Sequence, residues 1–253
     1  MILSGASLAE RLDFVLPNVE KPSRYTGGEW NSVTKDWDEV EVTFALAFPD
    51  VYDVGMGHLG YKILYSILNR EEDIAAERVY APWIDMEEQM RRAGIPLYSL
   101  ESKHALSEFD IVGFTLQYEL SYTNILNMLD LGGIPLHSSE RGERDPLVIA
   151  GGPCVYNPEP LAPFIDFFYL GDAENTVVTI ARTVKQWKSA GGKSRKDLLK
   201  LAAQIPGVYV PSFYRAHYTP EGFFAGLEPI EEGVPKTIRR QVVQDLDAAP
   251  FPD

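Results

Sequence analysis

The chain has 253 residues, of which 45% are hydrophobic and 24% are charged, as in ordinary globular proteins. Its 23 basic and 37 acidic side chains give a formal net charge of −14, and a surface of this sign repels nucleic-acid phosphates and anionic lipid headgroups. We therefore expect neither a nucleic-acid partner nor a membrane. No run approaches the ~20 apolar residues that span a bilayer, and the first residues show no signal-peptide pattern, so we expect a cytoplasmic protein.

Cysteine and histidine residues, the common metal ligands, are few. Cys154 is the only cysteine, and a single thiol can neither form an internal disulfide nor hold an iron–sulfur cluster or a structural zinc alone. The four histidines show no metal-ligand spacing such as His-x-x-x-His. The sequence therefore predicts no metal site made of its own side chains, and we interpret Cys154 as a small residue in a tight turn.

Residues 1–38 predict an N-terminal arm with one short amphipathic helix at 7–16. From there, strands and helices alternate. Strands are predicted at 40–48, 78–80, 97–100, 110–116, 146–150 and 165–170, and helices at 58–69, 83–93, 121–131 and 174–190. This alternation predicts an α/β domain at 39–205 with a doubly wound, mostly parallel sheet of the Rossmann-like or flavodoxin-like type.

The last part of the chain has a different pattern. A helix is predicted at 195–203, and the basic cluster of Lys193, Arg195 and Lys196 is interpreted as its solvated start. A small antiparallel β appendage is predicted at 206–246. Its strands are expected at 207–218, 222–230 and 236–243. The Pro-rich stretch at 247–253 is typical of a linker.

Three stretches follow the predicted parallel strands at the ends where open α/β sheets bind ligands. They are the Gly-rich loop at 49–60, the polar residues at 115–119, and the turn at 151–157. Gly55-x-Gly57-x-x-Gly60 has the spacing of a dinucleotide fingerprint, but no acidic residue ends the second strand as NAD would need. Taken singly, each stretch is as well explained by a tight turn or a helix cap.

Taken together, these stretches resemble the cobalamin-binding-type domain that precedes the catalytic barrel in many radical S-adenosylmethionine (radical SAM) proteins, in particular a largely uncharacterised subfamily. The similar segments are Arg24-Tyr-Thr-Gly-Gly-Glu-Trp30, Phe48-Pro-Asp-Val-Tyr-Asp-Val-Gly-Met-Gly-His-Leu-Gly60, Val79-Tyr-Ala-Pro-Trp83, Phe114-Thr-Leu-Gln117, Ile149-Ala-Gly-Gly-Pro153 and Leu170-Gly-Asp-Ala-Glu174. The last of these resembles the Gly-Glu-Gly-Glu-like segment of such proteins.

The resemblance implies a module that binds cobalamin, a small-molecule cofactor, and presents it to a barrel. The residues that it implies for this role are Tyr52, Asp53, Gly55, Met56, Gly57, His58, Gly60, Thr115, Gln117, Tyr118, Gly151, Gly152, Pro153, Asn157, Gly171 and Glu174. No catalytic residue is expected among them. The partner would be the protein's own radical SAM barrel, and the final residues 250–253 look like the lead-in to it.

The sequence departs from the motifs of this family in two ways. The motif Asp-x-His-x-x-Gly, which supplies an axial histidine to cobalt, is not met, because Asp53 and His58 are five residues apart. The chain also has no Cys-x-x-x-Cys-x-x-Cys. The [4Fe–4S] cluster and S-adenosylmethionine are therefore expected only in the barrel.

Two other functions compete with the cofactor module. One is a degenerate cobalamin-type domain that binds no cofactor and serves substrate or partner recognition, an interpretation that the missing axial-histidine motif favours. The other is a free-standing nucleotide-dependent enzyme, for which the sequence offers no catalytic groups.

Overall fold

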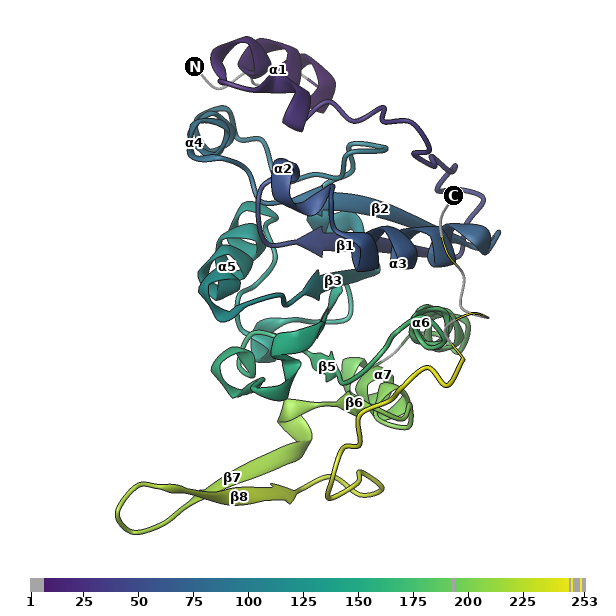
Figure 1. Cartoon of the computed structure of the whole chain (residues 1–253), viewed down its shortest axis with the longest axis vertical. Helices are drawn as coiled ribbons and strands as arrows, with labels where there is room; N and C mark the ends of the chain where they lie inside the picture. The colour runs from purple at the N-terminus through teal and green to yellow at the C-terminus, as the bar shows by residue number, and fades with distance from the viewer. Residues whose placement is uncertain (1–6, 193, 246, 248–250, 252–253) are drawn as a thin grey trace.

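The computed structural model describes residues 7–192, 194–245, 247 and 251 (Figure 1). Most of the predicted linker at 247–253, and Lys193 of the basic cluster, lie outside the described residues. The predicted first helix is present as α1 (Leu8–Val15), where the Ser7 side chain caps the backbone of Glu10 and the Glu10 carboxylate accepts from the Ser7 backbone. Within the described residues, no helix combines the length and apolar character that crossing a bilayer requires.

The main sheet has six strands in the order β2-β1-β3-β4-β5-β6. Their bounds are β1 Val42–Phe48, β2 Ile74–Tyr80, β3 Ile111–Thr115, β4 Leu147–Gly151, β5 Phe167–Tyr169 and β6 Val208–Tyr209. The first five strands are parallel, and β6 pairs antiparallel with β5. This confirms the predicted mostly parallel α/β sheet.

Helices cover both faces of this sheet, so its strands are buried on both sides. The helices after β1 are α2 (Tyr52–Gly55), α3 (Leu59–Arg70), α4 (Ile84–Ala93), α5 (Tyr122–Leu131), α6 (Val177–Ser189) and α7 (Arg195–Ala202). Helices α3, α6 and α7 share one hydrophobic core with Phe44 and Leu46 of β1. Helices α1, α4 and α5 share the other core with Ala45 and Ala47, as the alternation of side chains along a strand requires.

Several of the predicted strands are wrong in extent or pairing, and the strand predicted at 78–80 is longer, as β2. Residues 97–100 form only an isolated bridge, Tyr98 to Ala105. The predicted strand 207–218 is broken at Pro211, which has no N–H to donate. Its first part becomes β6 on the main sheet, and its second part becomes β7 (Tyr214–Tyr218), which pairs only with β8 (Phe224–Pro229).

The predicted strand at 236–243 does not join the appendage. Its hydrogen bonds go instead to the loop after β5, where Gln241 N donates to Leu170 O at 3.0 Å and Asp172 N donates to Gln241 O at 3.1 Å. The appendage is therefore the β7–β8 hairpin alone, which projects from the body of the molecule (Figure 1).

The interpretation of Arg195 as a solvated residue is also wrong. Asp166, which precedes β5, is buried and accepts from Arg195 Nη2 at 2.8 Å and from Arg141 Nη1 at 3.0 Å. The same carboxylate oxygen accepts from Val148 N at 2.7 Å. This buried ionic cluster joins β4, β5 and α7 at the amino ends of the strands.

Candidate functional site

The order of the sheet reverses between β1 and β3, because the chain leaves β1 toward β2 and later adds β3 on the other side. Ligands of open α/β sheets bind at such a switch point, outside the carboxyl ends of the strands. The loops after β1, β3 and β4 all lie at this edge, since the three strands are parallel neighbours. The three predicted stretches are thereby brought to one rim.

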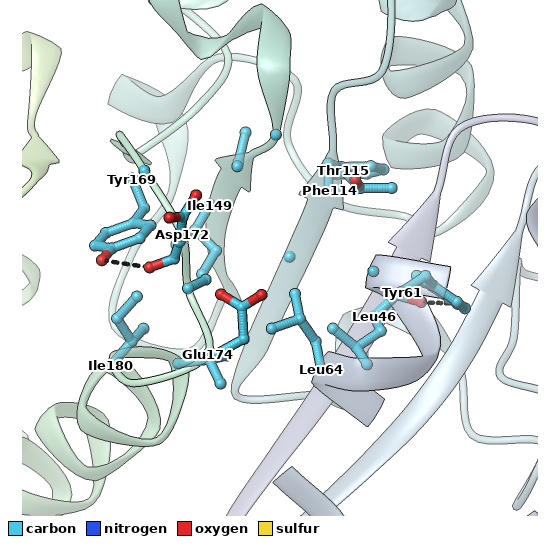
Figure 2. A pocket seen from close by; sticks show the side chains of 18 of the residues that line it. Leu46, Tyr61, Leu64, Phe114, Thr115, Ile149, Tyr169, Asp172, Glu174 and Ile180 are labelled. Carbon is cyan, nitrogen blue, oxygen red and sulfur yellow. Dashed lines mark hydrogen bonds between the residues drawn. The ribbon is translucent and has the colours of Figure 1, made fainter. Parts of the chain in front are cut away.

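An inner pocket of about 220 Å³ opens from this rim and runs between the sheet and helices α3 and α6. Its floor is apolar and comes from the strands, and Leu64 of α3 and Ile180 of α6 stand on either side (Figure 2). Gly113 of β3 forms part of the floor. A Cβ atom at this position would lie 2.7 Å from Cε1 of Phe44, so glycine is needed for the Phe44 ring to lie across the strand.

An outer pocket of about 480 Å³ lies on the rim itself, beside Pro49, Val54 and Tyr118. It shares three lining residues with the inner pocket: His58, Thr115 and Gln117. The two pockets therefore adjoin, with an apolar inner part and a polar threshold between them. Pockets of this kind, mostly apolar with a few placed polar groups, are the usual form of small-molecule sites.

His58 caps the N-terminus of α3, where its Nδ1 accepts from Tyr61 N at 3.2 Å. Because Nδ1 is the acceptor, the neutral ring carries its proton on Nε2. The ring thus offers an N–H donor, and not a free lone pair, to whatever lies at the threshold. Beside it, Gln117 Nε2 donates to Thr115 Oγ1 at 2.7 Å, which leaves the Gln117 carbonyl oxygen as an acceptor.

Two carboxylates from the loop after β5 line the inner pocket. Asp172 accepts from Val243 N at 3.1 Å. Glu174 makes no hydrogen bond or ion pair with any described residue, and Figure 2 shows its carboxylate turned into the pocket. Glu174 is half-buried, so its carboxylate is free to accept a hydrogen bond from a donor of a ligand.

The residue before these carboxylates, Gly171, is required to be glycine by the local backbone. Gly171 has a φ of +128°, and a Cβ atom there would lie 2.1 Å from Gln241 O. Only glycine can therefore pair with the segment at Gln241.

Ten of the predicted site residues line one or both pockets. They are Gly57, His58, Gly60, Thr115, Gln117, Tyr118, Gly151, Gly152, Gly171 and Glu174. Pro153 and Asn157 line neither pocket. They belong to the 3-10 turn that follows β4 and holds Cys154, whose pKa is raised chiefly by burial.

The other four predicted residues, on the loop after β1, contact the arm and β2. Asp53 forms ion pairs with Arg24 and Lys21, and the hydrogen bond from Arg24 lowers the pKa of Asp53. Burial raises the pKa of Tyr52 to about 12. Gly55 packs against Tyr80, and the Met56 sulfur accepts from the Tyr80 hydroxyl at 3.1 Å.

The inner pocket's apolar walls were not predicted from the sequence. Gly113 alone could have indicated this pocket, because a glycine inside a buried strand often marks a place where another group lies close to the backbone. Asp172 lies within the quoted segment 170–174, whereas Leu64 and Ile180 look like ordinary core residues of amphipathic helices. Among the described residues, no group of three or more His, Cys, Asp or Glu side chains could hold a metal ion.

Comparison with known proteins gives two matches. A family model described as "Radical SAM proteins, N-terminal" matches residues 60–211. An uncharacterized protein of Methanocaldococcus jannaschii is 26% identical over 161 residues, which are 62% of this chain and 30% of that protein. The aligned stretch therefore spans less than a third of this relative. No solved structure matches the chain.

Proposed function

This chain belongs to the N-terminal domain family of radical SAM proteins, and from that premise we propose that it binds a corrinoid such as cobalamin and presents it to a radical SAM barrel. The observation that carries the proposal is the two-part cavity at the switch point of the sheet. Of the three side chains that could have filled the cavity, Tyr52 and Met56 contact the arm and β2 instead, and Tyr118 lines the outer pocket with 48% of the residue exposed.

A corrinoid would occupy this cavity in two parts. The inner pocket, at about 220 Å³, is too small for a corrin ring but large enough for a flat aromatic base, such as the one that ends the nucleotide tail of cobalamin. The ring itself would lie on the rim, over the outer pocket, where Gly57 leaves the backbone accessible, and beside Gly151 and Gly152 of the inner pocket. A barrel would cover its other side.

The chain's own residues would orient the cofactor. His58 would donate from Nε2 to a polar substituent at the threshold, and Glu174 would accept from a donor in the inner pocket. With Nδ1 held by Tyr61 N, His58 is a poor axial ligand, in agreement with the missing axial-histidine motif. When bound, a corrinoid supplies a cobalt centre that can carry a methyl group. The [4Fe–4S] cluster and S-adenosylmethionine would belong to the barrel.

The test is to mix the purified chain with hydroxocobalamin, desalt it, and record the absorbance of the protein fraction under oxidising and reducing conditions. We expect corrin absorbance to elute with the protein. Leu64→Trp, which fills the inner pocket, should weaken binding by about tenfold or more, because the larger side chain occupies the space that the tail would take. Leu227→Trp on the distant hairpin is the matched control and should bind as wild type.

Two results would contradict the proposal. Absence of corrin absorbance under both conditions would exclude cofactor binding by this chain. Unchanged binding by Leu64→Trp would exclude the inner pocket as the place of the tail.

The rim also favours a second function, recognition of another domain or a substrate without a cofactor. Loops after successive strands expose apolar side chains there, with Trp83 44% exposed, Leu120 82% and Tyr156 57%. Apolar groups gathered at one edge suit an interface. Under this alternative, the separately expressed barrel region would bind the chain in size-exclusion chromatography. The double variant Leu120→Ser, Tyr156→Ser would abolish this binding. Hydroxocobalamin would have no effect on it.

A further inference from the structure

A third cavity lies away from the switch point, at the β2 edge of the sheet. Its volume is about 480 Å³, and it is bounded by α3, by β2 and by the arm segment at 30–33. The arm connects α1 to β1 along the chain, and Figure 1 shows it passing beside β2. The volume lies within the range of small-molecule sites, which is roughly 300–1,000 Å³.

The electrostatic character of this β2-edge cavity is opposite to that of the whole chain. Lys62, Ser66 and Arg70 follow one another at intervals of four on α3 and line one wall. Among the described lining residues, none carries a carboxylate, although the chain has a net charge of −14. A wall of this kind attracts an anion.

The two exposed cations, Lys62 and Arg70, have unused hydrogen-bond donors. The Lys62 side chain makes no hydrogen bond or ion pair with any described residue, and the Arg70 side chain donates, among the described residues, only to the carbonyl oxygen of Phe251, at 3.1 Å. The two positions are about 12 Å apart along the helix axis, so their long side chains can reach the same extended anion.

Arg78 stands behind them on β2, and its side chain is only 8% exposed. Glu101 and Glu29 neutralise it, through contacts of 2.6 and 2.8 Å. Its third nitrogen, Nη1, donates to the thioether sulfur of Met56 at 3.1 Å, and a thioether is a weak acceptor. An anionic oxygen would therefore be a better partner for this buried donor than the one it has.

An aromatic surface stands at the mouth of the cavity. Trp30 lines it, yet 93% of this side chain is exposed. Tryptophan normally buries a large part of its area, so an indole left in solvent beside a cavity offers a free face for stacking. Asn31, next in sequence, has a φ of +68°, a left-handed conformation that turns the chain sharply at this point.

From these features we infer that the β2-edge cavity is a nucleotide site, distinct from the corrinoid site proposed above. The base stacks on Trp30, and the phosphates take the donors of Lys62, Arg70 and Arg78 Nη1. Base stacking on aromatic side chains and charge-assisted bonds to phosphate are the ordinary means of nucleotide recognition.

The experiment is isothermal titration of the 253-residue chain with ATP, AMP and adenosine. We expect saturable binding of ATP and AMP, and adenosine binding at least tenfold weaker. Lys62→Glu with Arg70→Glu should weaken ATP binding by at least tenfold. Trp30→Ala should weaken ATP and adenosine alike. The charge-matched control is Arg144→Glu with Lys236→Glu, two exposed cations outside this cavity, and it should bind ATP as wild type.

Three outcomes would overturn the inference. They are no saturable ATP binding, equal binding of adenosine and ATP, or equal weakening by the charge-matched control. Hydroxocobalamin binding by the Lys62→Glu, Arg70→Glu variant is measured alongside, so that failure at one site can be told from failure at the other.

Discussion

At the scale of single residues, the most constrained group is the Asp166 carboxylate. It is 3% exposed as a residue, and it faces the Arg141 side chain, which has no exposed surface. Burial lowers the pKa of Arg141, because a charged guanidinium is costly away from water. The Arg141 guanidinium also donates to the carbonyl oxygens of Pro135, Leu136 and Phe164, so each of its three nitrogens has a partner. The cluster is stable only as long as its anion remains.

Asp166→Ala should therefore destabilise the chain strongly. It would leave two guanidinium groups buried without an anion, which costs about 3–5 kcal/mol. Urea unfolding followed by circular dichroism measures the change. Asp13→Ala is the control, since Asp13 is exposed, and its effect should stay within about 0.5 kcal/mol. A loss of less than about 1 kcal/mol in Asp166→Ala would contradict this account of the cluster.

At the scale of elements, α6 is tied to the turn before β2 by an ion pair. Lys185 Nζ donates to Asp73 Oδ2 at 2.7 Å, and this hydrogen bond holds the pKa of Asp73 below its usual value of 3.8. A carboxyl whose folded-state pKa is lowered stabilises the fold above its unfolded pKa. That stabilisation is lost as the pH falls through the folded-state pKa.

Asp73→Asn removes this contribution, so the variant should be less stable than wild type at about pH 6. The difference in free energy of unfolding should shrink as the pH falls below 3.8. Urea titrations at several pH values measure it. Asp13→Asn should show no such dependence, and a difference that grows toward acid pH would reverse the assigned sign.

Elements with a strong periodic pattern could be predicted from the sequence, and those that depend on distant partners could not. The strand predicted at 40–48 is present as Val42–Phe48, and the helix predicted at 58–69 is present as Leu59–Arg70. The first half of β2 was missed because Ala75, Ala76 and Glu77 are weak strand formers. Tertiary contacts hold it, since the Asn69 side chain bonds both backbone groups of Ala76.

The same distinction holds for the candidate site. The rim could be predicted, because loops after neighbouring parallel strands must meet at one edge of a sheet. The inner pocket could not, because its existence depends on the spacing between α3 and α6 and on the Phe44 ring that crosses Gly113. Neither helix spacing nor ring placement leaves a periodic trace in the sequence.

At the scale of the whole molecule, the β7–β8 hairpin is separate from the main sheet. Ala216 pairs with Leu227 on one face, and Arg215 pairs with Glu228 on the other. The apolar face is open, with Tyr218 64% and Phe224 59% exposed. A two-stranded hairpin contributes little stability alone.

Replacing residues 215–228 by a short turn should therefore leave the fold of the main sheet intact. The melting temperature should fall by less than about 4 °C, the shift that roughly 1 kcal/mol produces in a chain of this size. Differential scanning calorimetry measures it. Loss of the cooperative transition would mean that the hairpin supports the sheet.

Tyr61 belongs to the lining of both the inner pocket and the β2-edge cavity. Its hydroxyl donates to the carbonyl oxygen of Leu46 at 2.7 Å, which anchors the ring to β1. The Tyr61 side chain thus separates two cavities on the same side of the sheet. A ligand that tilts this ring enlarges one cavity and narrows the other. Because such coupling is reciprocal, each ligand then changes the affinity of the other.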